Sequence, residues 1–256
     1  MPARQKEIET VQTDNSFTKN RSGRIGQVMV ALDYPDAASA ERLLRQLEGI
    51  PCYMKVGMQL YYAAGPSFVA GLKERGYKVF LDLKMHDIPN TVKGGAESIT
   101  RLGVDMFNVH AAGGVRMMEA ALEGVDKAGG ARPLVIGVTQ LTSTDRRTMN
   151  EEIGIDGPVE DCVLRYAKLT QQAGLDGVVA SPVEVMRIKR ELGEGFVTVT
   201  PGIRPKGADI GDQARVMTPA EAFAQGTDYI VVGRPITGAD DPRQALESIG
   251  KELASE

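Results

Sequence analysis

The sequence predicts a single α/β domain built as a closed (β/α)8 or TIM barrel. Three observations favour this fold. Eight short runs of mainly apolar and β-branched residues alternate along the chain with longer stretches of helical periodicity. Several of these helical stretches end in a glycine just before the next apolar run. The length of 256 residues suits one such barrel, so we expect no second domain.

The apolar runs predict the strands of the barrel. We expect strands at residues 28–32, 53–56, 79–83, 106–109, 134–138, 177–179, 197–199 and 229–232. Because a helical stretch separates each run from the next, the strands should be parallel and joined by right-handed crossovers. An open doubly wound sheet is the alternative, and the number of units favours the closed barrel.

The stretches between the strands predict the outer helices. We expect helices at residues 37–47, 68–75, 92–102, 117–127, 159–172, 183–192 and 219–224, with a last helix from about Pro242. Helix stops are expected at Gly76, Gly103, Gly174 and Gly226, because glycine adopts the left-handed conformation that ends a helix. Residues 1–23 are polar and lack apolar periodicity, so we expect a flexible extension followed by a barrel domain at 24–256.

The composition excludes several classes of protein. A formal net charge of −4 argues against a nucleic-acid-binding protein, which normally needs a basic surface. No apolar run approaches the about 18 residues that a membrane span requires, and the N-terminus lacks the pattern of a secretory signal. Cys52 and Cys162 lie far apart and form no metal-binding pattern, which favours a reduced, cytoplasmic setting.

The strongest functional pattern is LDLKMHDIPNT at residues 81–91, where the third strand ends. Active sites of (β/α)8 barrels lie at the C-terminal ends of the strands. Residues two apart on a strand point the same way, so Asp82 and Lys84 should both face the barrel mouth, opposite to Leu81 and Leu83. Two charges on an apolar strand are costly unless they are paired or have a function.

A purely structural ion pair at the end of the barrel is the alternative interpretation of these charges. Lys55, in YMKVG on the second strand, should bring a second ammonium group to the same carboxylate, and such an array favours a functional site. Asp33 follows the first strand. Asp87 would extend the array if it projects into the same site.

Two further motifs predict a phosphate site. Arg204 in TPGIRP follows the seventh strand, and Gly233 and Arg234 in VVGRPIT follow the eighth. Barrels commonly bind phosphate in these two loops, where glycine lets the backbone approach and arginine supplies a bidentate donor. Two solvated surface turns are the alternative. The long loop 205–217 is either a plain exposed loop or a lid that brings Gln213 to the phosphate.

Weaker signals complete the set of candidate residues. Thr142 lies in TQLTST, whose hydroxyl and amide groups suit the polar edge of a heterocycle. His86 and His110 are the only histidines in the chain. Because they lack the ligand cluster of a metal site, we expect them to pack or to form hydrogen bonds.

These motifs, in this order, resemble the orotidine 5′-phosphate decarboxylase family of the bacterial type. The resemblance rests on ALDYP, LDLKMHDIPNT, VTQLTST, TPGIRP and VVGRPIT, and it extends from about residue 28 to residue 236. It implies that the substrate is orotidine 5′-monophosphate, that the products are uridine 5′-monophosphate and carbon dioxide, and that no metal or other cofactor is needed. It also implies a homodimer with shared active sites.

The same resemblance implies roles for individual side chains. Lys84 is the expected proton donor, and Asp82, kept ionised by Lys55, should lie against the substrate carboxylate. The remaining implied contacts are Asp33 and Lys55 with the ribose; Asp87, Ile88 and Thr91 with the neighbouring subunit's site; Thr142 with the pyrimidine and Pro182 as an apolar wall beside it; and Arg204, Gln213, Gly233 and Arg234 with the phosphate.

Two other functions remain open at this point. A related barrel, such as a keto-gulonate phosphate decarboxylase or a hexulose-phosphate synthase, would use magnesium and would need a further carboxylate at the end of the second strand. Here that strand carries Lys55, and no carboxylate follows it as far as Gln59. A non-catalytic nucleotide-binding barrel is the other alternative. Retention of both Asp82 and Lys84 argues against it, because nucleotide binding alone does not need this charge array.

Overall fold

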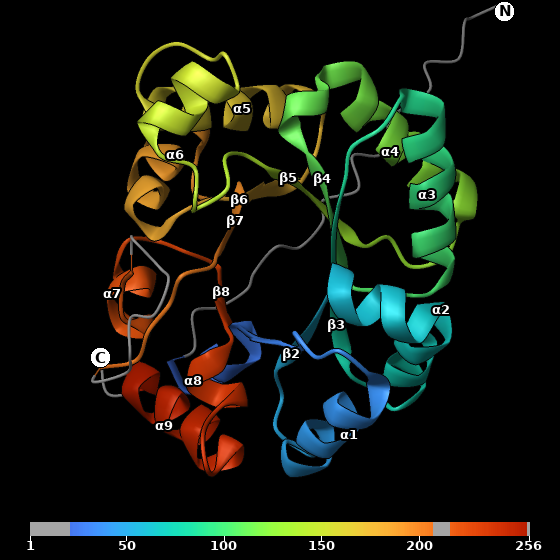
Figure 1. Ribbon diagram of the computed structural model, residues 1–256, viewed down its shortest axis with the longest axis vertical. Helices are drawn as coiled ribbons and strands as arrows, with labels where there is room; N and C mark the ends of the chain where they lie inside the picture. The colour runs from blue at the N-terminus through green and yellow to red at the C-terminus, as the bar shows by residue number, and fades with distance from the viewer. Residues whose placement is uncertain (1–20, 207–215, 255–256) are drawn as a thin grey trace, which may run out of the picture.

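The computed structural model describes residues 21–206 and 216–254. Eight parallel strands form a closed barrel in the order β1 to β8, each hydrogen-bonded to the next and β8 to β1. The helices surround the strands on all sides (Figure 1). The predicted (β/α)8 barrel is therefore confirmed.

All eight strands lie where the apolar runs predict them. Their bounds are β1 Val28–Ala31, β2 Tyr53–Gly57, β3 Lys78–Met85, β4 Met106–His110, β5 Leu134–Val138, β6 Gly177–Val179, β7 Val197–Thr200 and β8 Tyr229–Val232. The largest difference is in β3, which continues through the charged residues of the LDLKM sequence as far as Met85.

The long helices follow the predicted order. Their bounds are α1 Ala37–Gln46, α2 Met58–Glu74, α3 Pro89–Arg101, α4 Val115–Ala128, α5 Val159–Gln172, α6 Val185–Leu192, α7 Pro219–Ala224 and α9 Pro242–Ala254. The four glycines expected to stop helices all have left-handed backbones, with φ between 73° and 94°. Within the described residues, no helix is both long and apolar enough to cross a membrane.

The prediction for α2 was too short. Only residues 68–75 were expected to be helical, whereas the helix begins at Met58, directly after β2. Gly65 interrupts it with a φ of 72°, and Pro66 follows within the helix. A Gly-Pro pair normally marks a loop, so it hides the helical turns that precede it.

Several short helical turns were not predicted from the sequence. They are the 3-10 turns η1 Arg21–Gln27 and η2 Ala111–Gly113, the π-helical turn η3 Thr148–Glu152, and the four-residue helix α8 Arg234–Thr237. The 3-10 turn η4 Pro182–Glu184 forms the start of the helix expected at 183–192. Turns of this length carry no periodic apolar pattern. η1 packs against α9, and Ile25 lies close to Gly250.

Along each strand, residues point alternately toward the barrel axis and toward the helices. The inward-facing residues near the start of most strands form an apolar layer inside the barrel. The outward-facing residues, such as Val28, Val79 and Phe107, belong to the larger core between the strands and the helices. The next inward positions on β2, β3 and β4 carry polar side chains instead, and these lie toward the C-terminal end of the barrel. The apolar layer consists of Met29, Tyr53, Phe80, Met106, Ile136 and Val199.

At the N-terminal end of the barrel, a Gly-x-Asp sequence precedes each of β4, β6 and β8, and its aspartate links two neighbouring strands. In the last of the three, Asp228 donates its backbone N–H to the Thr198 carbonyl and accepts the Thr198 N–H through Oδ2 at 2.8 Å. The same two-way contact joins Asp105 to Val79 and Asp176 to Val135. A cation completes each unit, namely Lys189, Lys73 and Arg132 respectively.

We expect substitution of Lys189 by methionine to lower the free energy of unfolding by about 3 kcal/mol, because Asp228 loses its cation and two carbonyls lose a charged hydrogen-bond donor. The Lys189 side chain is 4% exposed, lies 2.6 Å from Asp228 Oδ2, and donates to the carbonyls of Glu194 and Phe196. Urea unfolding at one fixed protein concentration measures the change. The matched control is Lys168→Met, which breaks an exposed pair with Glu191. Equal, small losses in both variants would refute the structural role of Lys189.

Candidate active site

Four charged side chains of alternating sign form a chain across the C-terminal end of the barrel. Lys55 Nζ lies 3.0 Å from Asp33 Oδ1 and 3.5 Å from Asp82 Oδ2. Lys84 Nζ lies 2.6 Å from Asp82 Oδ1. The structure thus brings together Asp33, Lys55, Asp82 and Lys84, which come from three successive β-α units.

Exposure increases toward the two ends of this chain. The side chains of Lys55 and Asp82 are 9% and 13% exposed, whereas those of Lys84 and Asp33 are 25% and 62% exposed. Lys84 is therefore partly open to a ligand while Asp82 is enclosed. Gly57, at the end of β2, supplies room here, since a Cβ at that position would lie 3.3 Å from both Asp33 Oδ1 and Lys55 Nζ.

The Asp82 carboxyl is held in its charged form. Burial alone would raise its pKa, but the ammonium groups of Lys55 and Lys84 and the hydrogen bonds from Lys84 and Asn108 together hold the pKa below its usual value. Asp82 is therefore a carboxylate at neutral pH. Both of its oxygens face ammonium groups, so the donor set is poorly suited to a divalent cation.

Lys84 has an unusual backbone. Its φ of 51° makes it the one non-glycine residue with a left-handed backbone in the described part of the chain. For a residue with a side chain, this conformation costs about 1 kcal/mol. It occurs in a bulge, where residues 82–84 of β3 lie opposite the single residue Asn108 of β4. Bulges commonly redirect side chains next to active sites.

Asn108 was not among the residues expected in the site. It is 1% exposed, accepts the backbone N–H of Lys84 through Oδ1 at 2.8 Å, and donates from Nδ2 to Asp82 Oδ1 at 2.7 Å. The sequence MFNVH could have indicated Asn108, because it is a polar residue at an inward-facing position of an apolar strand. Lys55 in YMKVG was predicted from the same kind of pattern.

The two histidines lie beside the charged chain. The rings of His86 and His110 pack with their centroids 5.4 Å apart. Burial, followed by the nearby His86 and Lys84, lowers the pKa of His110 below its usual value. His110 is therefore neutral at pH 7 and adds no further positive charge to this end of the barrel. Among the described residues, no group of three or more His, Cys, Asp or Glu side chains could hold a metal ion.

The expected subunit-interface residues lie on the surface at the start of α3. Asp87, Ile88 and Thr91 are all exposed, and the Ile88 residue is 67% exposed despite its apolar side chain. Asp87 Oδ1 accepts the N–H of Ile88 at 2.6 Å. Within the described residues, neither Lys55 nor Lys84 forms an ion pair with Asp87. Asp87 is therefore not part of the row of charges formed by Asp33, Lys55, Asp82 and Lys84 of the same subunit.

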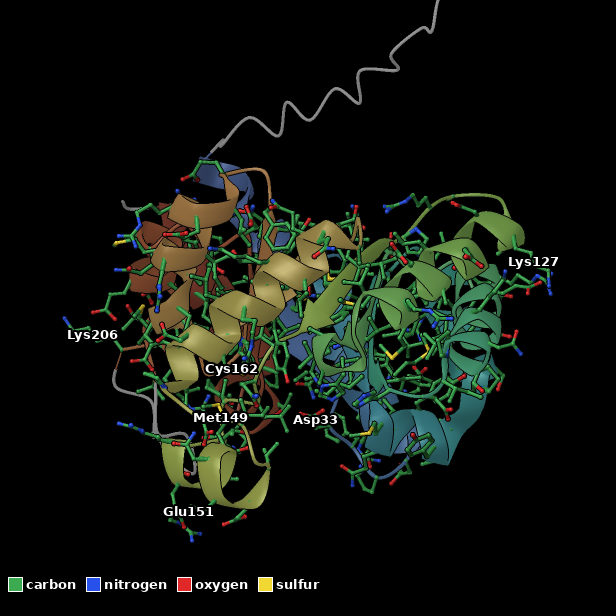
Figure 2. The ribbon with its side chains drawn as sticks, turned by 90° about the horizontal axis from the view of Figure 1, so that it is seen from above. Asp33, Lys127, Met149, Glu151, Cys162 and Lys206 are labelled. Carbon is green, nitrogen blue, oxygen red and sulfur yellow. The ribbon has the colours of Figure 1, made fainter. Side chains whose placement is uncertain are left out.

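The residues expected near the pyrimidine follow β5 and β6. Thr142 is half-buried in a turn that the Thr144 N–H closes on the Leu141 carbonyl at 2.9 Å. Pro182 is buried and begins η4. Further along the β5–α5 connection, the turn that carries Met149 and Glu151 projects from the body at the same edge where Asp33 lies (Figure 2). Met149 is buried in that turn.

The expected phosphate residues follow β7 and β8. Arg204 is buried, and its backbone N–H bonds to the Met217 carbonyl at 3.0 Å, beside a bridge between Ile203 and Met217. Gly233 precedes the short helix α8, which Arg234 begins with an exposed side chain. A short extra helix after the eighth strand is a common feature of phosphate-binding barrels. Gln213 lies outside the described residues.

Known proteins match this chain over most of its length. Residues 26–249 match the model of the Orotidine 5'-phosphate decarboxylase / HUMPS family. Proteins named orotidine 5′-phosphate decarboxylase from Bacillus cereus (strain Q1) and Geobacillus thermodenitrificans (strain NG80-2) are 51% and 53% identical to it, over 88% of this chain and 96% and 95% of theirs.

Solved structures agree with these matches. The crystal structure of orotidine 5′-phosphate decarboxylase from Lactobacillus acidophilus has a TM-score of 0.81 and 41% identity, covering 88% of this chain and 98% of that one. An uncharacterized conserved protein from Geobacillus kaustophilus has a TM-score of 0.79 and 47% identity, covering 88% and 99%.

Proposed function

The chain belongs to the orotidine 5′-phosphate decarboxylase / HUMPS family, and from this membership we infer that it converts orotidine 5′-phosphate to uridine 5′-phosphate and carbon dioxide in pyrimidine biosynthesis. The observation that carries this conclusion is the Asp82 carboxylate held between two ammonium groups, with Lys84 Nζ at 2.6 Å. The relatives above are named for this activity.

We propose that Lys84 stabilises and protonates the reaction intermediate. Carbon dioxide leaves when the bond between the ring and the carboxylate breaks, and the electron pair remains on the ring carbon as a vinyl carbanion. The site must favour this new charge more than the carboxylate that it replaces. The Lys84 ammonium can do so, and it then donates its proton to the same carbon.

Asp82 is proposed to act on the substrate carboxylate. Because Asp82 is ionised at neutral pH, it repels a second carboxylate placed against it, and departure of carbon dioxide relieves that repulsion. Lys55 helps to keep Asp82 charged and, with Asp33, is proposed to bind the ribose hydroxyls; the contact of 3.0 Å between Lys55 Nζ and Asp33 Oδ1 supports this. One chain of charges would thus bind the sugar at its Asp33 end and act on the ring at its Lys84 end.

Arg204, Gln213, Gly233 and Arg234 are proposed to bind the phosphate, while Thr142 and Pro182 are proposed to contact the pyrimidine. The phosphate would lie away from the bond that breaks. Its binding energy can therefore be used to exclude water and to orient the ring at Lys84, instead of only tightening substrate binding.

The other branch of the family would use magnesium to stabilise an enediolate. Such a site needs a carboxylate at the end of the second strand. That strand instead carries Lys55, whose ammonium group lies 3.5 Å from Asp82 Oδ2. A divalent cation at Asp82 would therefore meet two positive charges. This arrangement supports the decarboxylation of a nucleotide without a metal ion.

An ultraviolet assay tests this function. Purified protein is added to orotidine 5′-phosphate in excess EDTA, and the absorbance of the substrate is followed. A rapid decrease supports decarboxylation without a divalent metal. No decrease, in a folded protein that still binds uridine 5′-phosphate, would contradict it and would favour a nucleotide-binding barrel.

We also propose a homodimer in which Asp87, Ile88 and Thr91 complete the neighbouring subunit's site. Two observations support this. Ile88 is a large, exposed apolar residue, and Asp87 lies at the surface without an ion pair to the lysines of its own chain, within the described residues. The setting is proposed to be the cytoplasm, where the buried thiols of Cys52 and Cys162 would stay reduced.

Mixing two inactive variants should restore activity if the sites are shared. Lys84→Ala removes the proton donor, and Asp87→Ala removes the residue given to the neighbour. A mixed dimer contains one site with neither change, so activity should reappear after the two variants exchange subunits. Sedimentation at several concentrations checks the dimer itself. Absence of recovery in proven mixed dimers would place Asp87 outside the shared site.

A further inference from the structure

The left-handed backbone of Lys84 needs a partner that the sheet does not supply. In the bulge of β3, residues 82–84 lie opposite Asn108 alone, and Asn108 has no paired residue on that strand. The backbone N–H of Lys84 therefore has no regular ladder acceptor. The Asn108 side chain takes this role, with Oδ1 accepting the N–H at 2.8 Å.

The other end of the same amide holds the Asp82 carboxylate. Asn108 Nδ2 donates to Asp82 Oδ1 at 2.7 Å, and Lys84 Nζ contacts that same oxygen at 2.6 Å. Asn108 is 1% exposed, so both of its bonds are shielded from water. One buried amide thereby connects the backbone of Lys84 to the carboxylate that its own ammonium group contacts.

We propose that Asn108 is a positioning residue for the reaction: it fixes the bulge so that the Lys84 ammonium and the Asp82 carboxylate meet the reacting carbon from fixed positions. This inference rests on the proposed decarboxylation. Without the amide, the Lys84 backbone can relax from its left-handed conformation, and the ammonium group shifts with it. Displacement of a reacting group by about 1 Å is enough to cost about 100-fold in rate.

A merely structural role would have a different signature. A buried asparagine also stabilises the fold by satisfying neighbouring polar groups, and its loss then reduces stability. Such a loss leaves the rate per folded molecule unchanged. The chemical step and the affinity for product must therefore be measured separately, because a positioning residue affects mainly the first.

The test compares Asn108→Ala and Asn108→Asp with the wild-type protein. Alanine removes both bonds. Aspartate has the same shape and can still accept the Lys84 N–H, but it cannot donate to Asp82 when ionised and places a second carboxylate against it. We expect kcat for orotidine 5′-phosphate to fall about 100-fold in both variants, with the Kd for uridine 5′-phosphate within about threefold of wild type.

The control is Thr100→Val, which removes a buried hydroxyl that bonds within α3 to the Ala96 carbonyl. It should change the melting temperature without changing kcat. A kcat within about threefold of wild type in either Asn108 variant would overturn the inference, as would equal losses of kcat and product affinity. If alanine prevents folding, the aspartate variant decides.

An inactive wild-type protein would overturn the proposed function as well, whereas an active wild type with active Asn108 variants overturns only this inference.

Discussion

Replacing Lys84 by alanine is expected to reduce kcat/KM for orotidine 5′-phosphate by about 10⁴-fold or more, because it removes the ammonium group that we propose to stabilise the carbanion and to donate a proton to it. The fold should survive. Asp82 keeps the ion pair with Lys55 and the hydrogen bond from Asn108, and alanine accepts the same backbone conformation at no greater cost. Affinity for uridine 5′-phosphate should therefore remain measurable, by calorimetry or by competition.

Lys78→Ala is the matched control for this prediction. Lys78 lies on the same strand, but at the exposed opposite end of β3, where its ammonium group lies 5.5 Å from the centre of the Tyr53 ring. We expect that variant to turn over at close to the wild-type rate. A Lys84→Ala enzyme within about tenfold of wild type, equivalent to roughly 1.4 kcal/mol in barrier, would rule out Lys84 as the proton donor.

The barrel could be predicted from the sequence because its strands are unusually distinct. Each is a short apolar run bounded by glycine or polar residues, and the helices between them impose parallel pairing. The inward-facing positions follow from simple alternation, which is why Lys55, Asp82 and Lys84 could be assigned to one end of the barrel. The ion pair between Lys55 and Asp82 joins inward positions of two neighbouring strands and follows from this alternation.

The bulge at Lys84 could not be predicted in the same way. The run from Leu81 to Met85 is consistent with a regular strand, and only the pairing with β4 reveals two extra residues opposite Asn108. A register shift depends on two strands together, so neither strand's own pattern contains it. Asn108 was missed for a related reason, because its side chain bonds to the backbone and carboxylate of the residues in this bulge.

The first half of α2 was missed because local signals conflict there. Gly65 and Pro66 have the composition of a loop, while the helical turns from Met58 are fixed by their position directly after β2. Tertiary packing overrides local propensity in such segments. The expected lid residue Gln213 lies outside the described residues, so its role stays a prediction.

Replacing Arg234 by alanine should act through the phosphate. Two charge-assisted hydrogen bonds from one guanidinium group contribute about 1.5 to 3 kcal/mol each, so we expect kcat/KM for orotidine 5′-phosphate to fall between about 10² and 10⁴-fold. Binding measurements separate this effect from a general loss of structure. Wild-type protein should bind uridine 5′-phosphate much more tightly than uridine, and the variant should lose most of that difference while binding uridine as before.

Arg101→Ala provides the control, because Arg101 is an exposed arginine at the end of α3 that pairs with Glu97. Its removal should leave both affinities unchanged. The Arg234 result also separates the two halves of the proposed site. The proposed phosphate site and the proposed proton donor come from different strands, β8 and β3, so the Arg234 variant should keep the contacts of the Lys84 side with the rest of the ligand. Unchanged discrimination between uridine 5′-phosphate and uridine in that variant would place the phosphate elsewhere and would remove the reason to assign the β8 loop to the active site.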